Sequence, residues 1–330
     1  MPDILMIVVI ICSLSFDYIN GFHDTANAIA TSVSTRALTP RRAVWLAAGL
    51  NLLGALYSTG VAKTIGGDIV KSAHLVNEHT IISAMLGAIC WNLLTWWFGI
   101  PSSSSHALIG GIIGAVMISK GSEALNIEGI LKIVGSLIFS PVIAMITGLI
   151  IMIALFWIFG RMAPAKLNFR FKKMQVLSAA MMSFSHGSND AQKAMGIITL
   201  ALVSSGYLPT FEVPFWVKLA AATAMGCGTA AGGWRIIRTM GGKIFKLEPI
   251  TGFAADVNSS LVIFGATLLH LPVSTTHVVS GSIMGIGSAK RIHAVRWGVA
   301  QQMVMAWVLT IPSTAVVSAI IYKLITVIFL

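Results

Sequence analysis

Two acidic residues of this sequence lie inside long apolar runs, and each is followed one helical turn later by a polar side chain. Asp24 precedes Asn27, and Asp190 precedes Lys193. An ionisable group within such a run is costly unless it is paired, hydrated or functional. The oxygens of Asp24 and Asn27 are ligands that a hard cation such as Na⁺ accepts. A carboxyl group can instead bind and release a proton, or it can stay protonated and pin helices together. The pattern indicates a cation site or a proton relay more than a purely structural acid.

The neighbours of the two acids differ. His23 lies beside Asp24 and could tune either a cation site or a proton site. Lys193 stands where the other passage has Asn27, on the same helical face as Asp190. Its ammonium could take the place of a bound cation, so we hypothesise that this half binds no metal ion there. The alternative is a structural Asp190–Lys193 pair.

Two clusters of hydroxyl residues each follow a proline and open an apolar run. Ser and Thr at such a place are helix N-caps, and a helix N-terminus offers free N–H groups and a positive dipole end. Two such termini that approach each other would enclose a tetrahedral oxyanion. Ser and Thr are often only small packing residues in membrane helices. Two matched clusters, each followed by a histidine (His106 and His277), favour anion binding by Ser103, Ser104, Ser105, Ser274, Thr275 and Thr276.

The composition places most of the chain in lipid. Of the 330 residues, 56% are apolar and 10% are charged, and the mean hydropathy is +0.86. A soluble domain carries roughly 25% charged residues. The sequence therefore excludes a soluble enzyme, a nucleic-acid-binding module and a disordered chain. The net charge of +11 reflects membrane topology, because the basic residues fall in short gaps between apolar runs.

About ten apolar runs are long enough, or nearly long enough, to cross a bilayer as helices. The runs 103–119 and 274–289 are short and are predicted to be half-helices of re-entrant, broken hairpins. Lys and Arg concentrate in the gaps after the first, fifth, seventh and ninth runs, which predicts that these gaps are cytoplasmic and that both termini lie outside. The runs are 4–33, 43–62, 80–99, 103–119, 129–160, 174–204, 215–233, 250–270, 274–289 and 296–329.

The sequence repeats itself. The passage around Asp24 recurs around Asp190 at an offset of 166, and the Pro–hydroxyl–His segment recurs at an offset of 171. The halves 1–160 and 161–330 each hold an odd number of crossings, so the second half is predicted to be inverted, with no soluble domain. Inverted repeats with broken helices that meet at mid-membrane are typical of secondary transporters.

Two other acids are weaker candidates. Asp256 lies near the start of a run and could take part in cation or proton coupling, but its counterpart in the first half is Met85. Asp17 lies within the first run, where helix capping or a place at the membrane interface explains it equally well.

At these motifs the chain resembles the inorganic phosphate transporter (PiT) family. The resembling passages are Asn20–Ala28, Ser185–Ala194 and the two Pro–hydroxyl–His segments, in order along nearly the whole chain. The resemblance implies a carrier for inorganic phosphate that is usually dimeric and is driven by a cation gradient. It implies that Asp24, Asn27, Asn189 and Asp190 lie at the cation and phosphate centre and that the hydroxyl clusters line the phosphate site.

His23 and Lys193 depart from the pattern of sodium-coupled members. With these two residues the chain looks like the bacterial low-affinity type of the family, which resembles proton symporters that carry phosphate together with a divalent metal. The resemblance therefore favours H⁺ as the coupling ion, with Na⁺ at Asp24 and Asn27 as the alternative.

The sequence thus predicts an all-α carrier of the cytoplasmic membrane that imports phosphate by alternating access. It predicts no enzyme activity, no cofactor and no nucleic-acid partner. The rivals are a Na⁺-coupled phosphate symporter, a sulfate permease, an anion channel and a membrane-embedded lipid hydrolase. Buried acids within broken repeats favour a carrier over a channel, and no nucleophile–base motif supports a hydrolase.

Overall fold

The computed structural model describes residues 4–329, and this part of the chain is helical without a β-sheet. Within a bilayer each backbone polar group must be satisfied inside the protein, and a helix does this within its own segment. Eight of the ten predicted runs each fall on one helix, and the runs 43–62 and 174–204 are each divided between two helices, which confirms the all-α class. The α-helices are α1 (Ile4–Ser34), α2 (Pro40–Ala55), α3 (Gly60–Gly67), α4 (Glu78–Phe98), α5 (Ser104–Lys120), α6 (Ile127–Phe159), α7 (Pro164–Asp190), α8 (Gln192–Ser204), α9 (Phe215–Ala231), α10 (Trp234–Gly242), α11 (Pro249–Leu268), α12 (Thr275–Lys290) and α13 (Trp297–Phe329).

Four of the described helices, α1, α4, α6 and α13, are long and apolar enough to cross a membrane alone. A fifth span results if α2 and α3, which meet at a bend of 71°, are counted together. The apolar runs therefore correspond to helices, but most of those helices are too short or too polar to count as spans by themselves. The run 174–204 is divided at Ala191 into α7 and α8, and the short helix α10 falls outside every predicted run.

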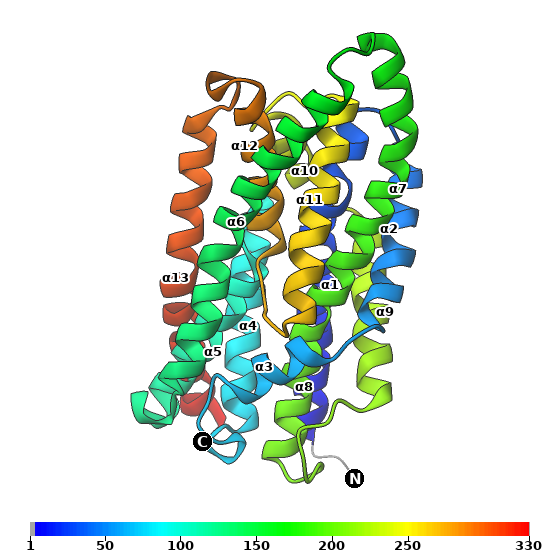
Figure 1. Cartoon of the computed structure of the whole chain (residues 1–330). Coiled ribbons are helices and arrows are strands. Elements are labelled where there is room, and N and C mark those ends of the chain that lie inside the picture. The colour runs from blue at the N-terminus through cyan, green and yellow to red at the C-terminus, as the bar shows by residue number, and fades with distance from the viewer. Residues whose placement is uncertain (1–3, 330) are drawn as a thin grey trace.

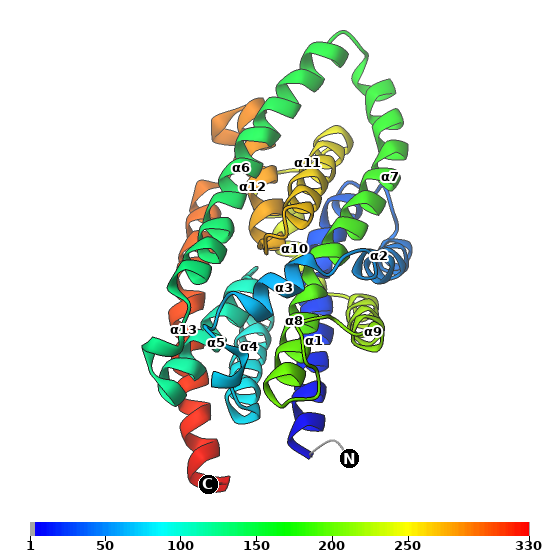
Figure 2. The same cartoon turned by 60° about the horizontal axis from the view of Figure 1, so that its bottom comes forward.

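The helices form one elongated bundle with α1 in its middle. Figures 1 and 2 place α6 and α13 along one edge and α2 and α9 along the opposite edge. Both chain ends lie at the same end of the bundle, at the bottom of Figure 1, and the α1–α2, α6–α7 and α12–α13 connections lie at the other end.

The helices pack in matching pairs. α6 packs on α12 as α13 packs on α5, and α2 packs on α7 as α9 packs on α1. Glycines allow the close approaches: a Cβ on Gly114 would lie 2.0 Å from the carbonyl oxygen of Ala315, and one on Gly285 would lie 2.0 Å from that of Met145. The first contact joins α5 to α13 and the second joins α12 to α6, and α6 and α13 are the two longest described helices.

Two helical hairpins bring broken helix ends into the bundle. α4 packs against α5 and α11 packs against α12, each pair joined by a short loop. The α4–α5 hairpin opens toward the end that holds the termini, and α11–α12 opens toward the opposite end (Figure 1). A residue with left-handed backbone follows the first helix of each hairpin closely, Gly99 (φ 65°) in one and His270 (φ 58°) in the other. This conformation turns the chain toward the start of the next helix.

The buried apolar side chains form two clusters, and α1 contributes to both. Its residues up to Phe16 belong to one cluster, and its residues from Ala26 onward belong to the other. The polar segment of α1 between them is the part that faces the two hairpin turns. The fold therefore places a polar centre between two apolar ones.

Candidate functional site

The starts of α5 and α12 meet in the middle of the bundle, and we call these two starts the helix tips. Ser105 Oγ of one tip donates to the carbonyl oxygen of Val273 beside the other, at 2.9 Å. The rings of His106 and His277 lie 4.5 Å apart between centroids, and Trp307 stacks on His277 at 3.9 Å. The two N-termini are therefore in contact, as the oxyanion hypothesis requires.

Asp24 contacts both tips. Ser104 Oγ donates to Asp24 Oδ2 and Thr276 Oγ1 donates to Asp24 Oδ1, each at 3.3 Å. His23 Nδ1 lies 2.7 Å from Asp24 Oδ1, and its other ring nitrogen reaches Thr95 Oγ1 at 3.2 Å. His23 thus ties Asp24 to the end of α4, and the carboxylate receives one hydroxyl from each half of the chain.

Asp190 lies next to the same tips but has a cation beside it. Lys193 Nζ is 2.9 Å from Asp190 Oδ1, and both side chains are fully buried. Thr275 Oγ1 donates to Asp190 Oδ2 at 3.2 Å, and Asn20 Nδ2 donates to the same oxygen at 3.4 Å. The expected Asp190–Lys193 pair is present, and it joins α7 to α8 at the centre.

Two asparagines hold the second tip in place. Asn27 Nδ2 donates to Thr275 Oγ1 at 3.2 Å and to Thr276 Oγ1 at 2.9 Å. Asn27 Oδ1 is buried and has no hydrogen-bond donor among the described residues. Asn189 donates to Leu271 O at 3.2 Å and accepts from Val273 N–H at 3.3 Å, so its amide is engaged by the α11–α12 loop. Phosphate contact by Asn189 stays a prediction.

The six predicted hydroxyl residues divide by role. Ser103 and Ser274 accept from the backbone N–H of His106 and His277, so they are N-caps as expected. Ser105 links the tips. The remaining three reach the acids, and none of the six is more than 3% exposed. The polar centre is closed to both ends of the bundle, with donors and carboxylates in contact with one another.

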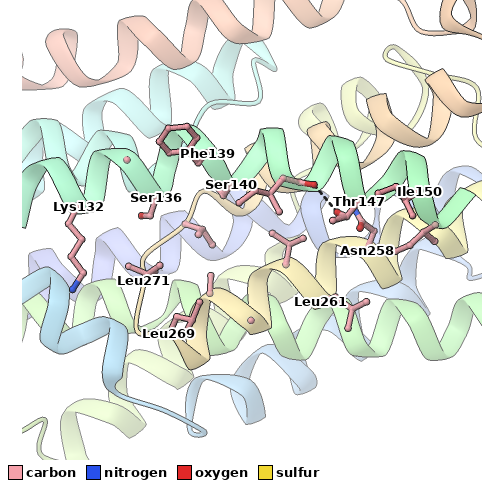
Figure 3. Close-up of a pocket in the computed structure, with 17 residues that line it drawn as sticks. Lys132, Ser136, Phe139, Ser140, Thr147, Ile150, Asn258, Leu261, Leu269 and Leu271 are labelled. Atoms are coloured by element: carbon pink, nitrogen blue, oxygen red, sulfur yellow. Dashed lines mark hydrogen bonds between the residues drawn. The ribbon is translucent and has the colours of Figure 1, made fainter.

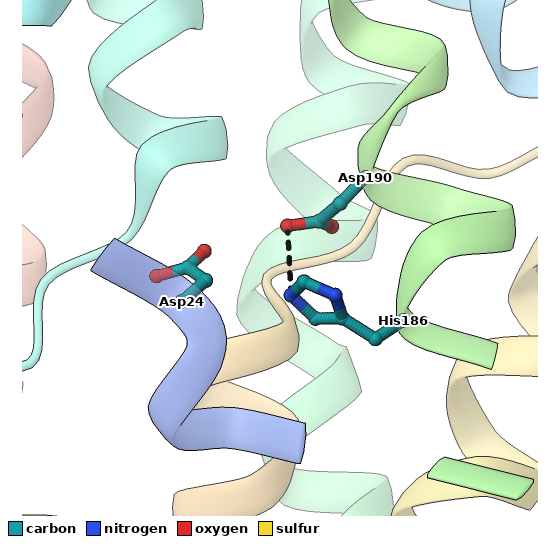
Figure 4. A group of neighbouring side chains, drawn as sticks. All are labelled: Asp24, His186 and Asp190. Carbon is teal, nitrogen blue, oxygen red and sulfur yellow. Dashed lines mark ion pairs between the residues drawn. The ribbon is translucent and has the colours of Figure 1, made fainter. Parts of the chain in front are cut away.

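His186 is a site residue that the sequence reasoning missed. It lies four residues before Asp190, and its Nε2 is 3.5 Å from Asp190 Oδ2. Asp24, His186 and Asp190 each offer one atom that could bind a metal ion. These three atoms lie within 4.8 Å of one another (Figure 4). His186 Nδ1 contacts Asn51 Oδ1 at 3.1 Å, a second contact of the kind that orients a metal-ligating imidazole. The i,i+4 spacing to Asp190 was the available signal.

The structure separates two other acids from the tips. Asp256 accepts from Thr31 Oγ1 at 2.5 Å and from Ser178 Oγ at 3.0 Å. Thr31 lies about 10 Å further along α1 than Asp24, by helix rise. Asp17 is fully buried more than three turns inside α1, which begins at Ile4. The expectation that Asp17 caps a helix is wrong, because α1 starts earlier.

A large groove lies apart from the polar centre. It has a volume of about 760 Å³ and lies between α6 and α11, where Phe139, Leu261 and Leu269 are among its lining residues (Figure 3). Its lining is almost wholly apolar, with Lys132 at one end. Such a surface fits lipid contact and offers no oxyanion site.

Comparison with known proteins agrees with this geometry. A profile of the phosphate transporter family matches residues 20–171 and 161–318. A relative from Bacillus subtilis (strain 168), described as a "Probable low-affinity inorganic phosphate transporter", is 53% identical over 328 residues, which cover 99% of this chain and 98% of the relative. A relative of the same description from Rhizobium meliloti (strain 1021) is 46% identical over 320 residues and covers 96% of each chain.

A solved structure has the same fold. It is described as "The sodium-dependent phosphate transporter", its TM-score is 0.91, and it is 26% identical over 99% of this chain and 100% of the other. Fold and site together define a multi-pass membrane transport protein and not an enzyme. The chain belongs to the phosphate transporter family, which confirms the resemblance seen in its motifs.

Proposed function

We propose that this protein is a secondary symporter that imports inorganic phosphate together with protons by alternating access. The observation that carries the proposal is the meeting of two capped helix N-termini with two buried carboxylates at one closed place. Helix N-termini favour an oxyanion, and carboxylates favour a cation or a proton. A centre that suits both at once, and is closed to both ends, fits a carrier better than an open anion channel.

Phosphate would bind where hydroxyls and carboxylates now contact each other. Ser104 and Thr276 would turn their donors from Asp24 toward phosphate oxygens, and Thr275 would do the same from Asp190. A protonated phosphate carries an O–H that a carboxylate accepts, whereas sulfate at neutral pH has none. A site built on that hydrogen bond rejects the analogue that lacks it, which makes a sulfate permease the weaker alternative.

The coupling ion follows from the asymmetry of the two acids. Lys193 already supplies a cation beside Asp190, so the second half has no need of a mobile one. His23 contacts Asp24 directly and offers a second group that exchanges protons. Na⁺ is the alternative, supported by the unsatisfied Asn27 Oδ1 and by the likeness to a solved phosphate transporter that is described as sodium-dependent.

A divalent metal could travel with phosphate as cargo. Asp24, His186 and Asp190 supply two carboxylates and one imidazole at suitable spacing. The ammonium of Lys193 pairs with Asp190, so one carboxylate oxygen of Asp190 would have to leave that pair to bind the metal. No resident cofactor is part of the proposal.

We propose that residues 1–160 and 161–330 are inverted repeats of one transport unit, with α4–α5 and α11–α12 as re-entrant hairpins. The matching helix pairs and the opposite directions of the two hairpins support this. The basic gaps, such as those around Arg41, Arg170 and Arg291, join helices at the end opposite to the termini. We therefore assign that end to the cytoplasm, both termini to the outside, and the protein to the cell membrane. From the family resemblance we also propose that it is a homodimer.

Uptake of labelled phosphate into proteoliposomes tests the proposal. An inward pH gradient and an inward Na⁺ gradient are imposed separately, each with and without Mg²⁺. Accumulation is expected to follow the pH gradient and to be independent of Na⁺. Accumulation that follows Na⁺ and ignores pH would assign the coupling ion to Na⁺, and flux without accumulation under any gradient would indicate a channel.

A further inference from the structure

A continuous stripe of buried polar side chains runs along one face of α1. Its members recur at spacings of four and three residues, which keeps them on one side of a helix. Each is at most 2% exposed although the helix is otherwise largely apolar. The stripe passes through the polar centre and extends toward both ends of the bundle, and it comprises Ser13, Asp17, Asn20, Asp24, Asn27 and Thr31.

The two halves of the stripe differ in how they are satisfied. Beyond the centre, Thr31 donates to Asp256, so the acid on that side has hydrogen bonds. On the side of the chain termini, Ser13 Oγ, Asn20 Oδ1 and both carboxylate oxygens of Asp17 are buried with no hydrogen-bond partner among the described residues. An acid that is buried without any donor is stable only when it is protonated or when a cation reaches it.

Asp17 is placed to communicate with the centre. It lies seven residues before Asp24, which is about 10 Å along the helix. Asn20, one turn further, donates to Asp190, and its own carbonyl oxygen faces no donor in the described part of the chain. Through Asn20 this part of α1 is connected to the buried pair of Asp190 in α7 and Lys193 in α8.

The other helices around α1 contribute few ionisable groups to this region. The buried faces of α2, α4, α9 and α10 carry none. Asp256 of α11 is bound at Thr31, and His277 of α12 stacks on Trp307 behind the tip. Lys193 is therefore the one buried ammonium among the described residues, and it pairs with Asp190. The buried His186 of α7 lies 3.5 Å from the same carboxylate.

We propose that Asp17 is the outer proton-binding residue of the carrier, loading from the external side along Ser13 and exchanging with the centre through Asn20. This inference rests on the proposed proton-coupled function and extends it to a residue outside the phosphate site. When Asp17 is protonated it is neutral, and Lys193 stays paired with Asp190. Deprotonated Asp17 attracts Lys193, which loosens Asp190 for the incoming phosphate proton.

A proton fits this place better than a metal ion. The oxygens of Ser13, Asp17 and Asn20 come from one face of one helix, so they cannot surround a cation that needs six or more oxygen ligands. Lys193 also brings a fixed positive charge that repels a second cation. A proton needs one oxygen and no coordination sphere.

The test compares Asp17→Asn with Asp17→Glu and with Asp68→Asn, whose carboxylate is 41% exposed and pairs only loosely with Lys132. Two assays are run in proteoliposomes: counterflow of labelled phosphate at equal pH, and accumulation driven by an imposed pH gradient with internal pH followed by a dye. We expect Asp17→Asn to retain counterflow but to lose pH-driven accumulation and the associated proton influx. Asp17→Glu keeps both, and Asp68→Asn behaves as wild type.

The outcomes separate this inference from the proposed function. A wild-type protein that ignores the pH gradient would overturn proton coupling itself. A wild type that responds, together with an Asp17→Asn variant that still accumulates phosphate and takes up protons, would overturn only the role of Asp17. Loss of counterflow in both Asp17→Asn and Asp17→Glu, with the proteins folded by circular dichroism, would also overturn it, because the residue would then be structural.

Discussion

The Asp24 and Asp190 sites occupy matching places in the two halves of the chain, yet they are completed differently. Asp24 has the amide of Asn27 three residues later, with a buried oxygen that faces no donor within residues 4–329. Asp190 has the ammonium of Lys193 at 2.9 Å. Both carboxylates accept a hydroxyl from the second helix tip, and Asp24 also accepts one from the first. In the proposed mechanism, the second half would keep a permanent cation while the first half would gain and lose one.

This comparison predicts the largest effect for Asp24→Asn. The variant keeps the shape of the side chain but removes the exchangeable charge, and its amide nitrogen no longer accepts from one of the two tip hydroxyls. We expect concentrative phosphate uptake to fall to the level of protein-free vesicles, measured with labelled phosphate under a pH gradient. Normal accumulation in this variant would remove Asp24 from the coupling mechanism, and Asp68→Asn controls for loss of an unrelated acid.

Lys193→Asn should give the next largest effect, because it makes the second site resemble the first. Removing one partner of a buried ion pair leaves an uncompensated charge and costs several kcal/mol, so uptake without Na⁺ should fall by about tenfold or more. The new amide oxygen should let Na⁺ restore part of the activity. Lys193→Met lacks that oxygen and should not respond to Na⁺. Unchanged transport and ion dependence in Lys193→Asn would reduce the pair to a structural role.

The tip hydroxyls sharpen the comparison at the level of substrate affinity. Ser104→Ala removes a donor that faces Asp24, and Thr275→Ala removes one that faces Asp190. A hydrogen bond to a charged group contributes about 1.5–3 kcal/mol, so each variant should raise the KM for phosphate by about tenfold or more. Ser105→Ala is the matched control, because its hydroxyl is engaged by Val273 O. An equal change of KM in all three would place the phosphate elsewhere.

The smallest effects are expected at the two caps. Ser103→Ala and Ser274→Ala each remove one N-cap bond, which costs about 1 kcal/mol of stability. Thermal unfolding of the purified protein should shift downward for both variants, by similar amounts, while the KM for phosphate stays within about threefold of wild type. A shift at one tip alone would show that the halves carry unequal shares of the stability.

The hydroxyl and acid motifs were predictable because the residues that make them are local in sequence. A proline followed by Ser or Thr specifies a capped helix start, and both caps are present. The Asp190–Lys193 pair follows from i,i+3 spacing in the same way. Asp17 was misread because periodicity shows that a residue lies on a helix face but not which neighbours cover that face. His186 was missed although its i,i+4 spacing to Asp190 was visible, because only the packing of α7 against α1 brings both residues near Asp24.

The sequence by itself determined that this is an all-helical membrane protein, that its motifs recur in two halves, and which residues cap the broken helices. These properties depend on composition and on spacing along one helix, where each residue's neighbours are given by the chain itself. Only the tertiary structure decided that the two tips touch, that one hydroxyl from each reaches Asp24, and that Asp17 is buried without a donor. Those facts depend on how helices distant in sequence pack, and close packing through glycines and shared hydrogen bonds fixes that arrangement.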